Sequence, residues 1–120
     1  QLIGDGINQT TTAFLVNFAN AGQWGYDAYI APKASVQDGL MDIAIVNKFP
    51  LSAAPKLALN LFTHDIDENF YMNTVRSKAI TLIRENAGAI HIDGDPFEMP
   101  KELNIKIVED GLKVLVKKRF

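Results

Sequence analysis

Cysteine is absent from the 120 residues of the chain, which excludes disulfide bonds, thiolate metal sites and a cysteine nucleophile. An excess of charge is absent too, because twelve basic and fourteen acidic residues give a formal charge of -2. No global field would therefore draw in nucleic acid. No apolar run approaches the ~18 residues that span a bilayer, and we expect no signal peptide. These absences fit a cytoplasmic protein.

The size of the chain and its first residue indicate one domain from a longer protein. With 48% hydrophobic residues, the chain can bury one core but is too short for two. Gln1 is not an initiator methionine, and Leu2-Ile3 already has the composition of a strand. We therefore expect residues 1–120 to form a single domain, a fragment of a larger protein.

Segments rich in β-branched residues or with alternating polarity predict a mainly β fold. We expect a first strand over 10–19, buried on both sides, and a short edge strand near 23–30. Further strands are expected over 41–46, 70–83 (one or two), 89–92, 103–108 and 112–117, the last pair joined by a turn at Asp110-Gly111. Ser52 is the predicted N-cap of one helix over 53–62, with Pro55 in its first turn. This count predicts a β-sandwich with one inserted α-helix.

Two carboxylates flank a glycine at Asp93-Gly94-Asp95, after an apolar run and before a proline. A carboxylate pair on a loop between strands can be aimed at a substrate. An EF-hand is excluded, because its sixth and twelfth positions would be Glu98 and Asn104 in place of glycine and glutamate. The residues alone favour a structural turn in which aspartate accepts backbone hydrogen bonds.

Asp38 lies in another Asp-Gly turn, just before the apolar segment 41–46. Such an aspartate is usually structural, but a carboxylate beside exposed carbonyl groups can also bind a hard cation. The spacing leaves both interpretations open.

Five motifs, in this order, resemble the C-terminal domain of the diacylglycerol kinase-like lipid kinases, a family that includes bacterial diacylglycerol kinases and sphingosine kinases. They are Asn20, Gly22-Gln23-Trp24-Gly25, Ile30-Ala31-Pro32-Lys33-Ala34, Asp38-Gly39-Leu40-Met41-Asp42 and Ile92-Asp93-Gly94-Asp95-Pro96. The resemblance covers nearly all of the chain. It implies an enzyme of two domains, in which a β-sandwich faces a nucleotide-binding domain that this sequence does not contain.

The resemblance also implies roles for four residues. Asp95 falls where the family has a glutamate that acts as general base on the lipid hydroxyl. Asp38 falls on the family's magnesium ligand, and Ser35 and Leu40 fall on the other two ligand positions, where a leucine can offer only its carbonyl oxygen. Magnesium takes about six oxygens at ~2.1 Å and keeps several waters, so this set suffices. ATP would be bound mainly by the absent domain.

Two departures from the family pattern affect these expectations. Asp95 is one methylene shorter than glutamate, a loss of reach on the order of 1 Å that matters when geometry sets the rate. It leaves Asp93 as an alternative base, but we prefer Asp95 because Asp93 falls on a structural turn position. The cluster Gly22-Gln23-Trp24-Gly25 has also lost two of the family's glycines.

We therefore predict the substrate-side, C-terminal domain of an ATP-dependent lipid kinase, which transfers a phosphoryl group to a diacylglycerol-like hydroxyl and is inactive alone. The expected partners are a lipid with a free hydroxyl and the inner face of the membrane, contacted peripherally, and no nucleic acid. One alternative is a non-catalytic β-sandwich that binds lipid or protein. Another is a structural domain that forms a homodimer through an exposed strand edge.

Overall fold

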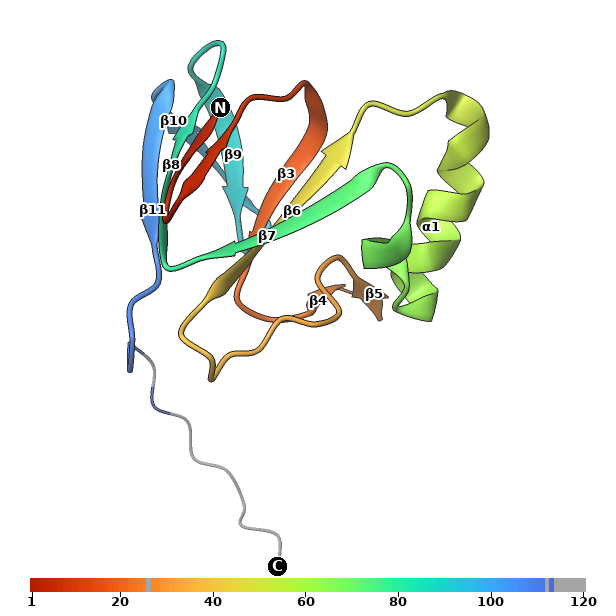
Figure 1. Cartoon of the computed structure of the whole chain (residues 1–120), viewed down its shortest axis with the longest axis horizontal. Helices are drawn as coiled ribbons and strands as arrows, with labels where there is room; N and C mark the ends of the chain where they lie inside the picture. The colour runs from red at the N-terminus through yellow and green to blue at the C-terminus, as the bar shows by residue number, and fades with distance from the viewer. Residues whose placement is uncertain (26, 112, 114–120) are drawn as a thin grey trace, which may run out of the picture.

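Two antiparallel sheets and a helical layer make up the computed structural model, which describes residues 1–25, 27–111 and 113 (Figure 1). The first sheet has the order β11 (Glu102–Lys106), β8 (Ala79–Ile83), β1 (Leu2–Gly4) and β2 (Ile7–Gln9). The central sheet has the order β3 (Ala13–Ala19), β6 (Met41–Asn47) and β7 (Met72–Ser77). Two hairpins complete the strands: β4 (Gln23–Gly25) with β5 (Ala28–Tyr29), and β9 (Gly88–Ile92) with β10 (Asp95–Met99). The mainly β prediction is confirmed.

The helical segments lie beyond the central sheet. They are the short 3-10 helix η1 (Leu51–Ala53), the single α-helix α1 (Ala54–Thr63) and a second 3-10 helix η2 (Ile66–Glu68). Figure 1 shows α1 on the side of the central sheet away from β8 and β11. None of the helices in the described part of the chain is long and apolar enough to cross a membrane.

Strand β6 is the centre of the core because it is buried on both faces. Met41, Ile43 and Ile45 pack in one cluster with residues of the first sheet. Ala44 and Val46 point the other way, into a cluster that includes Leu57 of α1. Successive side chains of a strand point to opposite faces, so a continuous apolar run fits only a strand that is covered on both sides.

The predicted strand over 10–19 was wrong in its start and in its burial. Strand β3 begins at Ala13, and most of its side chains are only partly buried. Phe14 is exposed, with its ring edge-on to Phe49 at 5.2 Å between centroids. The reason is topological: β3 is an edge strand of the central sheet, and β6 occupies the doubly covered position.

The start of the predicted helix also needs correction. Ser52 lies within η1, and α1 begins at Ala54 after Ala53, which provides no side-chain cap. Pro55 does lie in the first helical turn, where its missing N–H costs nothing. The helix ends at His64, which has a left-handed backbone conformation with φ 66°.

The remaining strands agree with the sequence in most places, but the single edge strand expected near 23–30 is the hairpin of β4 and β5. Segment 70–83 forms two strands, β7 and β8, as one of the two expected outcomes. Strand β11 ends at Lys106, two residues before the predicted end, and the short strands β2 and β10 were not predicted. The strand expected over 112–117 lies outside the described residues, apart from position 113.

A polar contact at Asp5 joins the β1–β2 turn to the end of β7. Its Oδ2 atom accepts hydrogen bonds from Ser77 Oγ at 2.7 Å and from the backbone N–H of Lys78 at 2.8 Å. These hydrogen bonds, that of Ser77 first, hold the pKa of Asp5 below its ordinary value of 3.8. Gly4 allows this approach, since a Cβ there would lie 2.6 Å from the carbonyl oxygen of Ala79. The first sheet is therefore held to the central sheet by polar as well as apolar contacts.

Candidate functional site

Ser35, Asp38 and Leu40 lie together on the loop between β5 and β6. The Leu40 N–H donates to Asp38 Oδ1 at 3.0 Å, and the Gln37 N–H donates to Ser35 Oγ at 3.2 Å. Gly39 has φ +67°, which closes the turn. Asp38 is exposed, and its second carboxylate oxygen takes part in no hydrogen bond among the described residues. The loop thus offers a free carboxylate oxygen at the end of the most buried strand.

The oxygen donors of this loop fit a magnesium ion in their chemistry. Within the described part of the chain, no cluster of three or more His, Cys, Asp or Glu side chains could hold a metal. A site here would use Asp38, turn carbonyls and waters, as hard cations allow. Glu109 adds a second carboxylate nearby, because a Cβ built on Gly39 would lie 3.4 Å from Glu109 Oε1. The sequence analysis missed Glu109, since 70 residues separate it from the turn.

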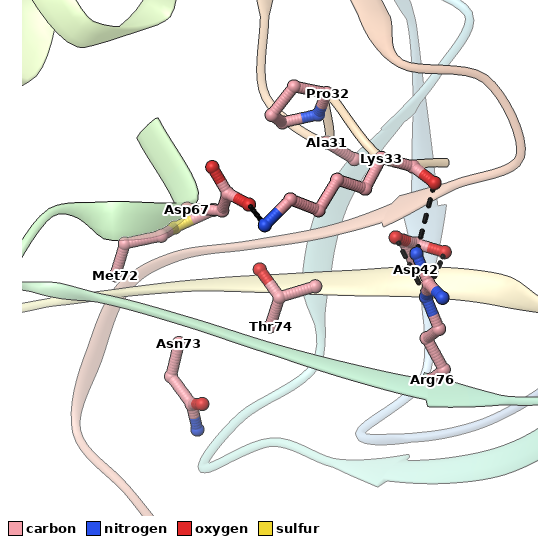
Figure 2. Close-up of a pocket in the computed structure, with 9 residues that line it drawn as sticks. All are labelled: Ala31, Pro32, Lys33, Asp42, Asp67, Met72, Asn73, Thr74 and Arg76. Atoms are coloured by element: carbon pink, nitrogen blue, oxygen red, sulfur yellow. Dashed lines mark hydrogen bonds and ion pairs between the residues drawn. The ribbon is translucent and has the colours of Figure 1, made fainter. Parts of the chain in front are cut away.

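A buried ion pair lies at the other end of the same motif. Asp42 is only 1% exposed, and it faces Arg76 across the β6–β7 ladder. Arg76 Nε lies 3.2 Å from Oδ1 and 3.3 Å from Oδ2 and donates its hydrogen bond to Oδ2. Arg76 Nη2 also donates to the carbonyl oxygen of Lys33 at 3.0 Å (Figure 2). A buried carboxylate is costly without a partner, so Arg76 both neutralises Asp42 and fixes the segment at Lys33.

A cavity of about 410 Å³ opens beside this ion pair. Its polar wall includes the ion pair of Lys33 Nζ with Asp67 Oδ2 at 2.7 Å, shown in Figure 2. The hydrogen bond from Lys33 to Asp67 raises the pKa of the lysine above 10.5. Asp42 Oδ1 and Thr74 Oγ1 are buried without a hydrogen-bond partner, so each has the capacity to bind a water or a ligand hydroxyl. The cavity is a polar site that the sequence analysis did not predict.

Asp95 lies in a different place, at the first position of β10. It pairs with Ile92 across a two-residue turn formed by Asp93 and Gly94. Both turn residues have positive φ, 51° and 89°, as a type I′ hairpin requires. The structure therefore gives Asp93 a turn conformation and leaves Asp95 exposed at the head of the strand. Pro96 is compatible with β10 because this strand pairs on one side only.

Arg84 holds the base of this hairpin. Its Nη2 atom donates to three carbonyl oxygens, those of Gly88 at 3.1 Å, Met99 at 2.8 Å and Pro100 at 2.7 Å. Among the described residues, no hydrogen bond or ion pair joins Asp95 to the loop of Ser35, Asp38 and Leu40. The two predicted sites therefore lie on different elements. The predicted metal site is on the loop that leads into the central sheet, and the predicted base is on the β9–β10 hairpin.

Two facing sheets, with acidic Asp-Gly turns at the ends of their strands, define a β-sandwich domain with candidate polar sites on its loops. The family model described as the YegS C-terminal NAD kinase beta sandwich-like domain matches residues 1–116. The chain belongs to this family, the C-terminal domain of YegS and diacylglycerol kinase-like lipid kinases. A comparison with curated proteins finds no match.

Proposed function

We propose that the chain supplies the general base and the magnesium site of an ATP-dependent lipid kinase, and that the acceptor is the hydroxyl of a diacylglycerol-like lipid. Membership of a lipid kinase family over residues 1–116 carries this proposal. It is supported by the exposure of Asp38 and Asp95, each on a turn that fixes its backbone. The nucleotide would be bound mainly by a second domain.

Asp95 is the proposed base. As the lipid oxygen attacks the γ-phosphorus, the hydroxyl proton passes to the Asp95 carboxylate, the bond from phosphorus to the β,γ-bridging oxygen breaks, and the nucleoside diphosphate leaves. Magnesium, when bound, would stabilise the charge that develops on the phosphate oxygens. Asp38, with Ser35 and the carbonyl of Leu40, would hold it, and Arg76 would keep the start of β6 in place.

The experiment compares three variants of the full-length protein in a lipid phosphorylation assay. Asp95→Asn should lower kcat by about 100-fold or more, since general bases contribute roughly that factor. Asp93→Asn, the matched control on the same turn, should keep most of the activity. Asp95→Glu restores the family's residue and its ~1 Å of reach, so it should be active. Thermal melting checks that all three are folded.

Near-normal turnover of Asp95→Asn would remove Asp95 from the mechanism. Loss of activity in Asp93→Asn alone would transfer the role of base to Asp93. Absence of lipid phosphorylation in the unmodified full-length protein, across diacylglycerol-like acceptors, would overturn the proposed function itself.

A further inference from the structure

Arg76 contacts both flanks of residues 35–40, the loop of the proposed metal site, which we call the Asp38 loop. Its Nε atom lies 3.2 and 3.3 Å from the two carboxylate oxygens of Asp42, which follows the loop. Its Nη2 atom donates to the carbonyl oxygen of Lys33, which precedes the loop, at 3.0 Å. Figure 2 shows the guanidinium between these two partners. We call the two contacts together the Arg76 bridge.

Few other bonds fix the geometry of the Asp38 loop. The hydrogen bonds within it are two local turn bonds, which end on Asp38 Oδ1 and Ser35 Oγ. Among the hydrogen bonds of the described residues, the one from Arg76 is the only one between segment 32–40 and the central sheet. The Arg76 bridge is therefore the direct tie between the start of the loop and the strand at its end.

The chemistry of arginine suits this place. Its guanidinium is planar and rigid, with donors that point in fixed directions, so one side chain can bond to two acceptors and hold them a set distance apart. The backbone of Arg76 is itself held, because β7 pairs with β6 along its whole length. Asp42 is 1% exposed, so the partner at the far end of the loop is fixed by burial as well.

The span of the loop decides which cation fits it. Magnesium requires near-octahedral oxygens at about 2.0–2.1 Å, whereas calcium accepts about six to eight oxygens at longer distances in flexible arrangements. A loop held short favours the smaller ion, and a loop free to spread loses that preference. We propose that Arg76 is a positioning residue that makes the Asp38 loop select magnesium over calcium, by fixing the distance between Lys33 and Asp42. This inference rests on the proposed function, which assigns the metal to this loop.

The charge of Arg76 separates positioning from simple electrostatics. A guanidinium near a cation site repels the cation, so its removal would by charge alone strengthen metal binding. If Arg76 positions the loop, its removal weakens magnesium binding although a positive charge is lost. Residues that orient the ligands of a metal typically change its affinity by about 10–100-fold when they are substituted. The two roles therefore predict changes of opposite sign.

Isothermal titration of the full-length protein without nucleotide measures the Kd of magnesium and of calcium, with Asp38→Asn as the blank for other sites. Arg76→Lys keeps the charge beside Asp42, but its single nitrogen cannot take the places of both Nε and Nη2. We expect it to raise the Kd of magnesium about tenfold and that of calcium by roughly threefold or less. Arg76→Met should weaken magnesium binding as well. Circular dichroism at the titration temperature establishes that each variant is folded.

Lys33→Met is the matched control. It removes a positive charge at the start of the loop together with the ion pair to Asp67, but it keeps the backbone carbonyl to which Arg76 donates. The Lys33 side chain is 70% exposed, and an exposed ion pair contributes little. The Kd of magnesium should therefore stay within about twofold of the value for the unmodified protein, with the preference over calcium unchanged.

Four outcomes would overturn the role of Arg76 and leave the proposed function in place. They are an unchanged Kd of magnesium in folded Arg76→Lys, an equal loss for both cations, tighter magnesium binding by Arg76→Met, and an equal loss in Lys33→Met. An unmodified protein that binds no magnesium at millimolar concentration would remove the metal site, and the role of Arg76 with it. Selectivity that depends on Arg76, in a protein that phosphorylates no lipid, would support the role of Arg76 and overturn the proposed function alone.

Discussion

The Asp38 loop and the Asp95 hairpin are supported in opposite ways. The loop leads directly into β6, whose first six residues are all buried. The hairpin has almost entirely exposed side chains along β10, and Ile92 beside its turn is 49% exposed. The loop is therefore positioned by the core of the domain. The hairpin is positioned by its own ladder and by the hydrogen bonds of Arg84 at its base.

This difference matches what each site would have to do. A metal site tolerates little movement of its ligands, and a loop at the end of a doubly covered strand is held on both faces. A base that approaches a lipid hydroxyl needs access more than burial. Elements with few buried contacts open locally at low free energy, so we expect the hairpin to be the less stable of the two regions.

The largest expected effect comes from truncating matched isoleucines in the two regions. Ile43→Ala removes a fully buried side chain from β6 and should lower the free energy of unfolding by about 3–4 kcal/mol. Ile92→Ala, in the half-exposed hairpin, should cost about 1 kcal/mol or less. Urea denaturation of both variants measures the difference. Equal losses would contradict the contrast between the regions.

Two arginines provide the second comparison. Arg76→Met leaves the Asp42 carboxylate buried without its partner, and we expect a loss of about 2 kcal/mol, less than for a fully buried pair because Arg76 is partly exposed. Arg84→Met removes three hydrogen bonds to backbone carbonyl groups, one exposed and two part-buried, and should cost about 1 kcal/mol. Amide hydrogen exchange should become faster around Gly88 and Met99 in Arg84→Met, and around Asp42 in Arg76→Met. The opposite pattern would contradict the assignment of Arg76 to the region of Asp42 and of Arg84 to the hairpin.

Magnesium binding tests whether the Asp38 loop is the metal site. At ten times its Kd, magnesium should stabilise the chain by about 1.4 kcal/mol, seen as a higher melting midpoint. Asp38→Asn should abolish the increase, and Glu109→Gln should reduce it, given the position of Glu109 beside Gly39. Asp95→Asn should leave it unchanged. An unmodified chain whose midpoint does not move at millimolar magnesium would argue against this site.

The smallest effect concerns acid stability. Hydrogen bonds, that from Ser77 Oγ first and then those from the Lys78 and Ala79 amides, lower the pKa of Asp5 in the folded chain below 3.8. A carboxyl group whose pKa is lower in the folded than in the unfolded chain stabilises the fold at pH values above its unfolded-state pKa. This stabilisation is lost as the pH falls through its folded-state pKa. Melting midpoints measured from pH 5 downwards should therefore fall less steeply in Asp5→Asn. Asp93→Asn, whose carboxylate accepts no hydrogen bond in the described residues, is the control.

The sequence predicted what depends on local pattern. The compact apolar segment 41–46 predicted a strand, and Asp110-Gly111 and Asp93-Gly94 predicted turns. It did not predict pairings between distant segments. Asp42 is separated from Arg76 by 34 residues, and neither residue's neighbours indicate the partner. The one available signal was the charge of Asp42 in an otherwise apolar strand, since a buried carboxylate requires a cation.

The errors have the same origin. The segment 10–19 has the composition of a buried strand, and only the strand order, with β3 at an edge, exposes Phe14. Strand β10 (Asp95–Met99) was not predicted, and Pro96 fits it because this strand pairs on one side only. In both cases the position of the segment in the tertiary structure outweighs its local propensity.

The two-residue length of the Asp93-Gly94 turn limits how the hairpin can vary. Asp95 and Phe97 are two positions apart on β10, so their side chains share a face of the ribbon. A substitution at position 95 changes how far the side chain extends, but a shift of the β9–β10 register by one residue would turn the carboxylate to the opposite face. Natural variants with such a shift are therefore expected to have lost the proposed base, even where an acidic residue follows the glycine.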